Sequence, residues 1–380
     1  MVTIAVTPEE TAETRVALSP EAAKKLVGFG CTVRVVSGSG AKSRFLDPAY
    51  QAAGATVMAT PQDALSGADV LLKVRRPTTA EVAALAPGAL VIAMLSPYDE
   101  AAGLAELAAS KASLFSMEFM PRITRAQSMD VLSSQANLAG YKVVVDAASL
   151  LDQAMPMMMT AAGTVPAARV FIMGAGVAGL QAIATARRLG AIVSATDVRP
   201  ATKEQVASLG AKFIAVEDDE FKQAQTAAGY AKPMSEAYQK KQAELVASHI
   251  ATQDIVITTA LIPGRPAPRL VTADMVRSMK AGAVIADLAA ERGGNCELTK
   301  PGSIAEVNGV RIWGPINLAG TVPINASALY ARNLVTFLET LYDKKEKVLK
   351  VNWDDEIVKG TLVAKDGRIV HPNLLPKEAA

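Results

Sequence analysis

A glycine-rich hexapeptide, GAGVAG at residues 174–179, constrains the fold of this 380-residue chain more than any other segment. An apolar run, Arg169–Met173, precedes it, and a helical pattern, Val177–Leu189, follows it. A second apolar run, Ile192–Thr196, comes next and leads directly into Asp197. This order of strand, tight turn, helix, strand and acid is typical of a dinucleotide-binding Rossmann unit. The alternative, a glycine-rich turn with no ligand, explains less of the context.

The physical demands of nucleotide binding assign a role to each glycine of the motif. Gly174 permits the tight turn, Gly176 lets the backbone approach the pyrophosphate, and Gly179 lets the helix pack closely on the strand. The start of the helix offers free N–H groups and a partial positive charge to the phosphates. The residues expected to bind a cofactor in this region are Gly174, Ala175, Gly176, Val177, Ala178, Gly179, Asp197, Val198 and Arg199.

Asp197 bears on the choice of nucleotide. Its carboxylate can accept hydrogen bonds from both ribose hydroxyls and would repel a 2′-phosphate, which favours NAD(H) over NADP(H). Arg199 leaves the other choice open, because a nearby arginine can bind such a phosphate. We expect NAD(H) binding in the micromolar range, with NADP(H) weaker by roughly tenfold or more.

Short apolar runs alternate with helical patterns along most of the chain, which predicts an α/β protein with parallel sheets. Its length accommodates two domains. Before residue 120 the expected strands are Thr3–Val6, Thr32–Val36, Val70–Val74, Leu90–Leu95 and Ala112–Met117. Beyond those flanking the glycine motif, the later strands are Lys212–Ala215, Ile255–Thr258, Val284–Asp287 and Val310–Trp313. The first half has no GxGxxG turn, so only the second half is expected to bind a nucleotide.

Other segments have weaker signals. Pro20–Val27 is an expected helix with Ser19 as its cap, and Ser327–Leu341 is another. Met155–Pro166 reads as a connection between domains, and the polar segment Glu217–Glu236 as a functional loop that orders over bound nucleotide.

Composition excludes several classes of function. The net charge is +2, from 39 basic and 37 acidic residues, which gives no reason to expect nucleic acid or an anionic membrane as partner. Two cysteines and two histidines are too few for a disulfide framework or most metal sites, so no metal is expected. The N-terminus lacks a signal-peptide pattern. The uncharged run between Arg169 and Arg187 is explained by strand, turn and helix, so no membrane insertion is expected.

A polar cluster precedes the second domain within Thr124–Tyr141, a segment expected to join the first unit to a long helix. On residue types alone, a solvated surface segment is favoured, because charged residues are mostly exposed. The alternative is that the segment folds over the cofactor and that its Arg, Gln and Asp anchor the nicotinamide amide. The cluster comprises Arg122, Arg125, Gln127, Asp130 and Ser133.

Several long motifs closely resemble the NAD(H)-binding domain I of proton-translocating transhydrogenase. They are MPRITRAQSMDVLSSQANLAGYK, TAAGTVPAARVFIMGAGVAGLQAIATARRLGA, GYAKPMSEAY, VITTALIPGRPAP, SMKAGAVIADLAAERGGNCE and the final GRIVHP region. The resemblance covers nearly the whole chain. It implies two Rossmann-like doubly wound parallel-sheet domains around a cleft. The first would comprise residues 1–135 and 325–380, and the NAD(H)-binding domain residues 136–324.

The same resemblance implies how the chain would act. It would form a homodimer and dock with an NADP(H)-binding domain III, and hydride would pass directly between NADH and NADP+. Membrane domain II subunits would couple the transfer to proton movement. The chain itself would be cytoplasmic, held at the inner face of the membrane through these partners.

The resemblance also implies site residues outside the glycine motif. Arg122 and Ser133 would hold the NADH head group, and Gln127 would reach the NADP(H) on domain III. Asp130 would fix its loop by pairing with an arginine or the nicotinamide amide. A mobile loop would close on the nucleotide. The remaining residues expected to bind the cofactor are Gly229, Tyr230, Thr259, Ala260 and Leu261.

Two points qualify this interpretation. Many relatives begin with the pattern PKE-x-x-PGE-x-RVAL, whereas this chain has TPEETAETRVAL, which keeps Arg15 but not the first Lys or the Pro-Gly. The fold also resembles alanine dehydrogenase, whose substrate lysine Lys73 could match. That enzyme also uses a first-domain histidine. The matching segment, VIAMLSPYD, has none, and no other histidine is expected in that domain. A nucleotide sensor without turnover is a third possibility.

Overall fold

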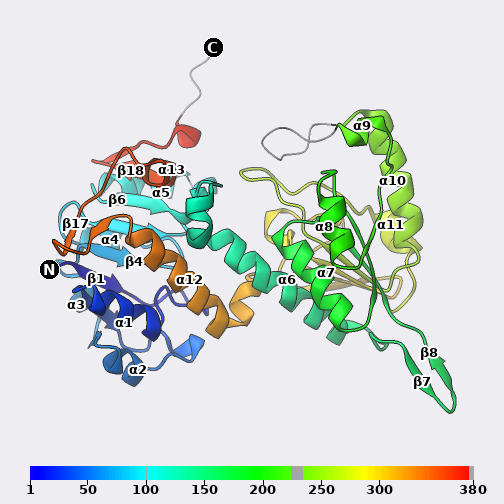
Figure 1. The fold of residues 1–380 in the computed structure, drawn as a ribbon, viewed down its shortest axis with the longest axis horizontal. Helices are drawn as coiled ribbons and strands as arrows, with labels where there is room; N and C mark the ends of the chain where they lie inside the picture. The colour runs from blue at the N-terminus through cyan, green and yellow to red at the C-terminus, as the bar shows by residue number, and fades with distance from the viewer. Residues whose placement is uncertain (100, 224–233, 376–380) are drawn as a thin grey trace. The chain divides into compact units, whose positions relative to one another are not determined.

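The computed structural model describes residues 1–99, 101–223 and 234–375 of the chain. These fall into two compact units, as Figure 1 shows. Unit 1 comprises Met1–Gln135 and Gly320–Ala380, and unit 2 comprises Ala136–Ala319. The family resemblance implies that the chain returns to the first domain between residues 324 and 325, which is inside helix α12 (Pro323–Leu338). The structural division at 319/320 keeps that helix whole within unit 1.

In the described portion of unit 1, eight strands form one sheet in the order β19-β18-β6-β5-β4-β1-β2-β3. The six strands β1 to β6 are parallel, while β18 runs antiparallel to β6 and β19 antiparallel to β18. The C-terminal segment therefore completes this sheet. The strands are β1 (Thr3–Val6), β2 (Thr32–Val36), β3 (Thr56–Met58), β4 (Val70–Leu72), β5 (Leu90–Ala93), β6 (Ser113–Ser116), β18 (Leu362–Lys365) and β19 (Arg368–Ile369).

Helices cover both faces of the unit 1 sheet. One apolar core joins α1 and α12 to strand residues such as Ile4, Val33 and Leu72, and the other joins α3, α4 and α5 to residues such as Leu71 and Val91. The helices of unit 1 are α1 (Pro20–Gly28), α2 (Asp47–Ala52), α3 (Pro61–Leu65), α4 (Thr79–Ala83), α5 (Ala101–Ala109), α12 and α13 (Glu356–Thr361). Short elements are η1 (Ala41–Ser43), η2 (Met117–Phe119), η3 (Thr124–Met129), η6 (Pro372–Leu374), β16 (Tyr342–Asp343) and β17 (Val348–Leu349).

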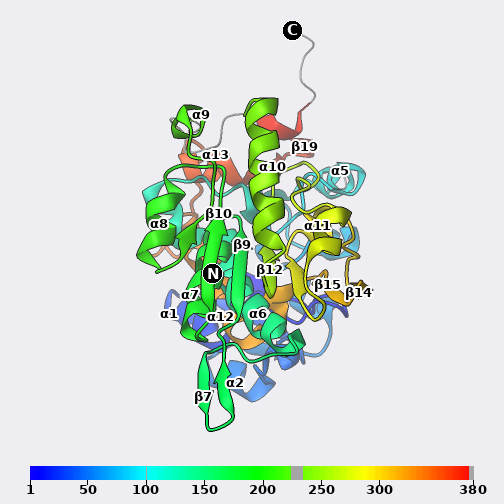
Figure 2. The ribbon, with the colours of Figure 1, turned by 90° about the vertical axis from the view of Figure 1, so that its right-hand side faces the viewer.

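Unit 2 is built around a second sheet, in the order β11-β10-β9-β12-β13-β15-β14. All its neighbours pair in parallel except β14 and β15. Figure 2 shows β10, β9 and β12 side by side at its centre. The strands are β9 (Arg169–Met173), β10 (Ile192–Thr196), β11 (Lys212–Phe213), β12 (Ile255–Thr258), β13 (Val284–Asp287), β14 (Ile304–Val307) and β15 (Val310–Trp313).

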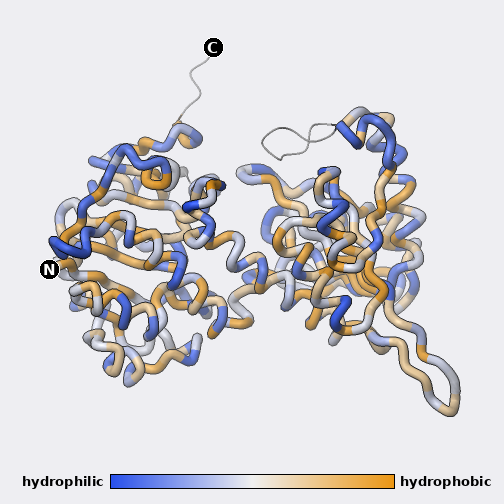
Figure 3. Tube along the Cα trace, viewed as in Figure 1, coloured by the Kyte–Doolittle hydropathy of each residue, from blue (hydrophilic) through white to orange (hydrophobic). Residues whose placement is uncertain are grey.

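The unit 2 sheet is also covered on both faces. Val170 and Ile172 of β9 face a core shared with α6 and α7, whereas Phe171 and Met173 face a core shared with α10 and α11. Figure 3 shows the hydrophobic residues concentrated along these strands. The remaining elements are α6 (Val131–Leu150), α7 (Val177–Arg188), α8 (Thr202–Ser208), α9 (Asp219–Lys222), α10 (Glu236–Ile250), α11 (Ala273–Ser278), β7 (Met158–Thr160), β8 (Gly163–Val165), η4 (Ala290–Arg292) and η5 (Leu318–Thr321).

The predicted α/β class with two Rossmann-like parallel sheets is confirmed, as are most strands and the helix capped by Ser19, whose side chain accepts a hydrogen bond from Ala22 N. Several expectations are corrected. Met155–Pro166 is not a plain connection but contains the hairpin β7–β8, and the long helix α6 already begins at Val131. The helix expected at Ser327–Leu341 starts at Pro323, since proline suits a first helical turn.

Sequence patterns missed β3 and β14, both of which lie at sheet edges. The segment Glu217–Glu236 contains the short helix α9 and the start of α10. Gly229 and Tyr230, expected to close over a nucleotide, lie outside the described residues. Along the described ranges, each helix is too short or too polar to cross a bilayer.

Candidate nucleotide-binding site

The glycine turn lies where the strand order of unit 2 reverses. Strand β9 is central, with β10 and β11 on one side and β12 and β13 on the other. In open α/β sheets, ligands bind at the carboxyl ends of the strands beside such a switch point. Here the turn after β9 meets the loop after β12: Thr259 N donates to Met173 O at 2.9 Å, and Thr259 Oγ1 donates to Gly174 O at 3.0 Å. The fold thus brings together two segments that were selected separately in the sequence.

Two glycines of the turn have no room for a side chain. Gly174 has a φ of +107°, and a Cβ there would lie 2.5 Å from Thr259 Oγ1. A Cβ on Gly179 would lie 1.8 Å from Gly174 O, so helix α7 packs against the turn at a distance that only glycine allows. These contacts fix the path of the backbone from β9 into α7.

Gly176 differs from its neighbours. A Cβ on it would meet nothing within 4 Å, so open space lies above the turn. Gly176 is also the N-cap of α7, and it supplies no side-chain hydrogen bond to the first turn of that helix. Open space beside uncapped N–H groups is what a pyrophosphate needs in order to approach the backbone. The turn therefore fits a dinucleotide, with Val177 exposed at the start of the helix.

Asp197 stands next to this turn, directly after β10. Its Oδ2 accepts a 2.7 Å hydrogen bond from Ala175 N, so the acid and the turn hold one another in place. Arg199 also pairs with this carboxylate: Nε lies 2.9 Å from Oδ1, and Nη2 lies 2.9 Å from Oδ2. The hydrogen bonds to Asp197 raise the pKa of the Arg199 guanidinium. Val198, between the two, is exposed.

The loop after β12, Thr259–Leu261, is held by residues that the sequence analysis did not select. Asn295 is fully buried; its Oδ1 accepts from Ala260 N at 3.0 Å, and its Nδ2 donates to Ala260 O at 2.9 Å. Asp287, also fully buried, accepts from Thr258 Oγ1 and Thr299 Oγ1. A polar residue at the end of an otherwise apolar strand was the available signal for Asp287. Leu261 itself is exposed.

The segment proposed for the nicotinamide end lies in unit 1. Asp130 receives two hydrogen bonds from Ser133, from the backbone N at 2.9 Å and from Oγ at 2.5 Å, at the start of α6. These bonds anchor the start of the helix, and the expected pairing of Asp130 with an arginine or a ligand amide stays a prediction. Arg125 forms a two-pronged ion pair with Asp355. Arg122 and Gln127 are exposed.

Helix α12 holds this segment from one side. Asn333 Nδ2 donates to Ser128 O at 2.8 Å, and Ser134 Oγ donates to Asn333 Oδ1 at 2.8 Å. Since Asn333 is buried, the segment around Gln127 is fixed by the body of unit 1. That is the property a residue needs in order to position a substrate.

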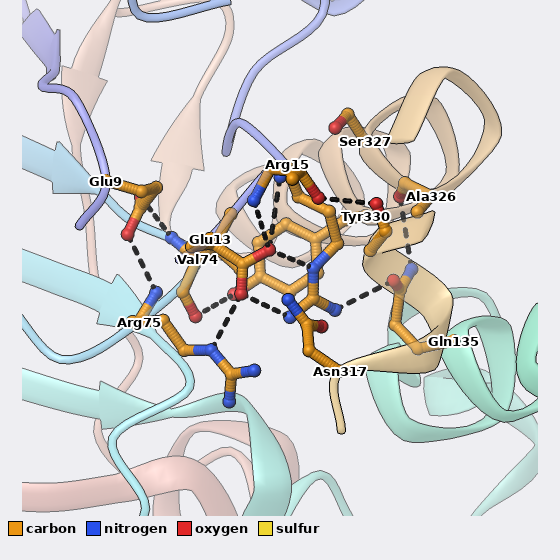
Figure 4. A network of polar contacts seen from close by, with 12 residues as sticks. Glu9, Glu13, Arg15, Val74, Arg75, Gln135, Asn317, Ala326, Ser327 and Tyr330 are labelled. Carbon is orange, nitrogen blue, oxygen red and sulfur yellow. Dashed lines mark hydrogen bonds and ion pairs between the residues drawn. The ribbon is translucent and has the colours of Figure 1, made fainter. Parts of the chain in front are cut away.

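The N-terminal loop contains a buried ionic pair, Glu13 and Arg15, although Pro8 and residues 10–12 of the same loop are exposed (Figure 4). Arg15 forms a two-pronged pair with Glu13, with both N···O distances 2.8 Å, and its Nη1 donates to Gln135 Oε1 at 2.9 Å. Arg75 Nε donates to the same Glu13 carboxylate at 2.8 Å. Burial opposes ionisation of Glu13, but the hydrogen bonds and charge of Arg15 outweigh it and lower the pKa of Glu13 to about 2.

Lys73, the candidate substrate lysine of an amino-acid dehydrogenase, belongs to a neighbouring network. Its Nζ donates to Pro8 O at 2.6 Å, to Thr7 Oγ1 at 3.2 Å and to Glu81 Oε1 at 3.3 Å. Glu9 lies 3.6 Å away, and burial raises the pKa of that carboxyl group despite the nearby lysine. All three N–H donors of Lys73 are therefore used within the chain.

Our expectation of a first domain without histidine is wrong, because the C-terminal segment brings His371 into unit 1. His371 is buried and stacked on Phe119, and its Nε2 lies 3.1 Å from Gly360 O. Burial lowers its pKa. The other histidine, His249, contacts Ser194 Oγ in unit 2, and burial lowers its pKa too. Among the described residues, no cluster of His, Cys, Asp or Glu could hold a metal ion.

Two doubly wound sheets, one with an open glycine turn and an acid at its switch point, define the class of dinucleotide-binding Rossmann proteins. Comparison with known proteins narrows this class. The chain belongs to the alanine dehydrogenase/PNT family: residues 5–139 match its N-terminal domain and residues 143–372 its C-terminal domain.

Sequence identities to individual relatives differ between the two branches of that family, transhydrogenase and alanine dehydrogenase. The chain is 55% identical to the first portion of NAD(P) transhydrogenase subunit alpha of Rhodospirillum rubrum over 367 residues, which is 95% of this chain and 96% of the relative. It matches the crystal structure of transhydrogenase from Sinorhizobium meliloti with a TM-score of 0.88 and 57% identity, over 97% of this chain and 100% of that one. Alanine dehydrogenase of Halomonas elongata is 30% identical over 94% of this chain and 92% of its own. The predicted resemblance to transhydrogenase is confirmed.

Proposed function

We propose that this chain is the NAD(H)-binding component of a proton-translocating, Si-specific NAD(P) transhydrogenase, active together with partner subunits. One observation carries the proposal: the turn at Gly176 is open and uncapped beside Asp197, at the switch point of unit 2. The high identity to transhydrogenase alpha subunits supports the reaction assigned to it. Bound NADH would supply a hydride from its nicotinamide C4 to the C4 of NADP+ held by a partner domain III.

Such a transfer needs no general acid or base, because both reacting groups are nicotinamides. The protein must orient the ring and exclude water. This suits a chain whose two histidines, His249 and His371, are each engaged within their own unit. An amino-acid dehydrogenase needs a proton carrier, and the internally bonded Lys73 makes that alternative less well supported.

We assign positioning roles to the unit 1 segment. Arg122 and Ser133 would hold the NADH head group, and Gln127 would contact the NADP(H) of domain III. Asp130, which already accepts two hydrogen bonds from Ser133, would fix the loop by pairing with an arginine or the nicotinamide amide. Thr259, Ala260 and Leu261 would add contacts from the loop that Asn295 holds. Gly229 and Tyr230 would contribute from the closing loop.

The test is stopped-flow hydride transfer in a complex reconstituted with an NADP(H)-binding domain III. Gln127→Asn should slow transfer by on the order of a hundredfold, since a misplacement of about 1 Å has that effect. NADH affinity should change little. Gln51→Asn, the same change at an exposed position on α2, is the control and should transfer at the parental rate. Parental transfer by Gln127→Asn would refute the assignment, and loss of NADH binding would place Gln127 in the NADH site instead.

The remaining elements of the proposal concern assembly. We propose a homodimer, which light scattering at tens of micromolar would test; a monomer mass would contradict it. We also propose that the chain is held at the cytoplasmic face of the membrane through domain II subunits. Absence of NADH-dependent transfer, together with NAD+-dependent oxidation of L-alanine, would favour the alanine dehydrogenase branch of the family.

A further inference from the structure

The acid expected to recognise ribose has no acceptor position left. Oδ1 of Asp197 accepts from Arg199 N and Arg199 Nε, both at 2.9 Å. Oδ2 accepts from Ala175 N at 2.7 Å and from Arg199 Nη2 at 2.9 Å. A carboxylate offers about four lone-pair sites, so these four bonds fill it. A hydroxyl donor can reach this carboxylate only if one of the present donors leaves.

The four donors differ in their freedom to leave. Two are backbone N–H groups: Ala175 is buried in the glycine turn, and the N–H of Arg199 is fixed by the loop after β10. The other two belong to the guanidinium of Arg199, at the end of a flexible side chain that is 31% exposed, whereas the Asp197 side chain is 6% exposed. The guanidinium is therefore the one group that can swing into solvent while the turn stays intact.

We propose that the Arg199 guanidinium is an internal competitor for the ribose diol of the nucleotide, occupying Asp197 in the free protein and leaving it when the nucleotide binds. This inference rests on the proposed NAD(H) function. Its departure would free one position on Oδ1 and one on Oδ2. Two vicinal hydroxyls, 2′ and 3′, supply one donor for each oxygen. The number and placement of the vacated positions thus match a diol.

The competition has a consequence for affinity. Every binding event must first break a two-pronged ion pair, so the guanidinium weakens nucleotide binding by the strength of its own pairing. A ligand without the two hydroxyls gains nothing from the exposed acid. Arg199 would therefore act on the ribose and leave the phosphate contacts of the turn unaffected.

The first test is the affinity of NADH for Arg199→Met, measured by calorimetry. Methionine keeps an unbranched side chain but removes the donors, so the Kd should fall by roughly fivefold, equivalent to about 1 kcal/mol. Arg199→Lys keeps a single ammonium and should give an intermediate value. The matched control is Arg188→Met, which removes the same charge at the exposed far end of α7 and should change the Kd by less than about twofold.

Ligands that differ only in the sugar locate the effect. AMP should bind Arg199→Met more tightly than it binds the parental chain, whereas 2′,3′-dideoxy-AMP should bind both chains equally. Weaker binding of NADH to Arg199→Met would overturn the inference, because Arg199 would then be a direct ligand. An equal gain for dideoxy-AMP would overturn it as well. A parental chain that does not bind NADH would refute the proposed function and this inference with it.

A measurement without nucleotide tests the starting state. In thermal unfolding of Asp197→Asn, Arg199→Met and the double variant, the ligand-free chains should show coupling between the two positions, roughly 2 °C for an interaction of this strength. Saturating NADH should abolish the coupling, because the pair is then broken. Additive effects in the ligand-free chains would overturn the inference.

Discussion

Units 1 and 2 order their parallel strands in the same way around a central first strand, yet the loops that follow that strand differ. In unit 1 the order is β3-β2-β1-β4-β5-β6, and in unit 2 it is β11-β10-β9-β12-β13-β15. After β9 the chain enters α7 through the short glycine turn. After β1 it follows a long loop, residues 7–19, before α1 begins at Pro20.

The contents of the two switch points differ accordingly. In unit 2, the first turn of α7 has no side-chain cap and a side chain at Gly176 would meet open space. In unit 1, Lys73 follows β4 and bonds back to Thr7 and Pro8, which follow β1. The corresponding end of the unit 1 sheet is thus occupied by a charged side chain of the protein itself. The comparison teaches that one sheet order can serve binding or stability, depending on the loop after its first strand.

The largest expected effect is on the stability of unit 1. Glu13→Gln would remove the carboxylate that pairs with the buried Arg15, and breaking a buried pair on one side costs about 3–5 kcal/mol. Chemical denaturation would measure the loss, and hydrogen exchange would localise it to unit 1. A matching loss of NADH affinity would contradict the contrast between the two units, since it would give the unit 1 network a role in binding.

The next effect is on binding in unit 2. Gly176→Ala places a methyl group in the open space above the turn, where it would overlap a bound pyrophosphate at a cost of roughly 2–3 kcal/mol. The Kd for NADH should rise by roughly 30-fold or more, with the melting temperature of the free chain unchanged. Gly28→Ala in unit 1, where a Cβ is equally free of contacts, is the control for binding. Unaltered affinity in Gly176→Ala would show that phosphate does not approach there.

Lowering the pH should destabilise unit 1 through protonation of Glu13. Its pKa is lowered to about 2 in the folded chain, so its stabilising contribution is complete above its unfolded value near 4.5 and is lost as pH falls toward 2. Between pH 5 and pH 3 this group should cost the parental chain about 2 kcal/mol. Glu9 acts in the opposite sense, because burial raises its pKa. Denaturation at both pH values should show a smaller acid loss in Glu13→Gln; equal losses would contradict the assignment.

The smallest effect concerns the two helix starts. Ser19 caps α1 through Ala22 N at 3.2 Å, whereas Gly176 gives α7 no such bond. Ser19→Ala should therefore destabilise unit 1 by about 1 kcal/mol and leave NADH binding as it is. Urea denaturation with parallel calorimetry would check this. A stability loss below a few tenths of a kcal/mol would mean that the cap contributes nothing in this fold.

The glycine turn was predictable from sequence because its requirements are local. A positive φ at Gly174 and a close contact at Gly179 can be met by one residue type, so the motif carries the geometry. The strands were predictable because buried parallel strands are continuous apolar runs. In an edge strand such as β14, exposed residues alternate with half-buried ones, which is a weaker signal.

What could not be predicted depends on partners distant in sequence. Asn295 holds Ala260 across 35 positions, and no local pattern announces such a bond. The pairing of Arg199 with Asp197 is close in sequence, but residue types alone left open whether the arginine faces the acid or a phosphate. His371 was overlooked as a histidine of the first domain, although residues 325–380 had been assigned to that domain, because it is remote in sequence from the strand β6 that β18 pairs with.

Unit 1 is built from two segments that are separated by unit 2 in the sequence, and this has a consequence for its synthesis. Strand β6 ends at Ser116, and its neighbour β18 begins only at Leu362, after the whole of unit 2. At about 5–20 residues per second, a ribosome needs tens of seconds to cover that interval. During that time β6 has an unpaired edge, and the core lacks Tyr330 and Phe337 of α12. Unpaired strand edges promote aggregation. The N-terminal part of unit 1 is synthesised first but is completed last, so it is the region of the nascent chain that most needs a chaperone.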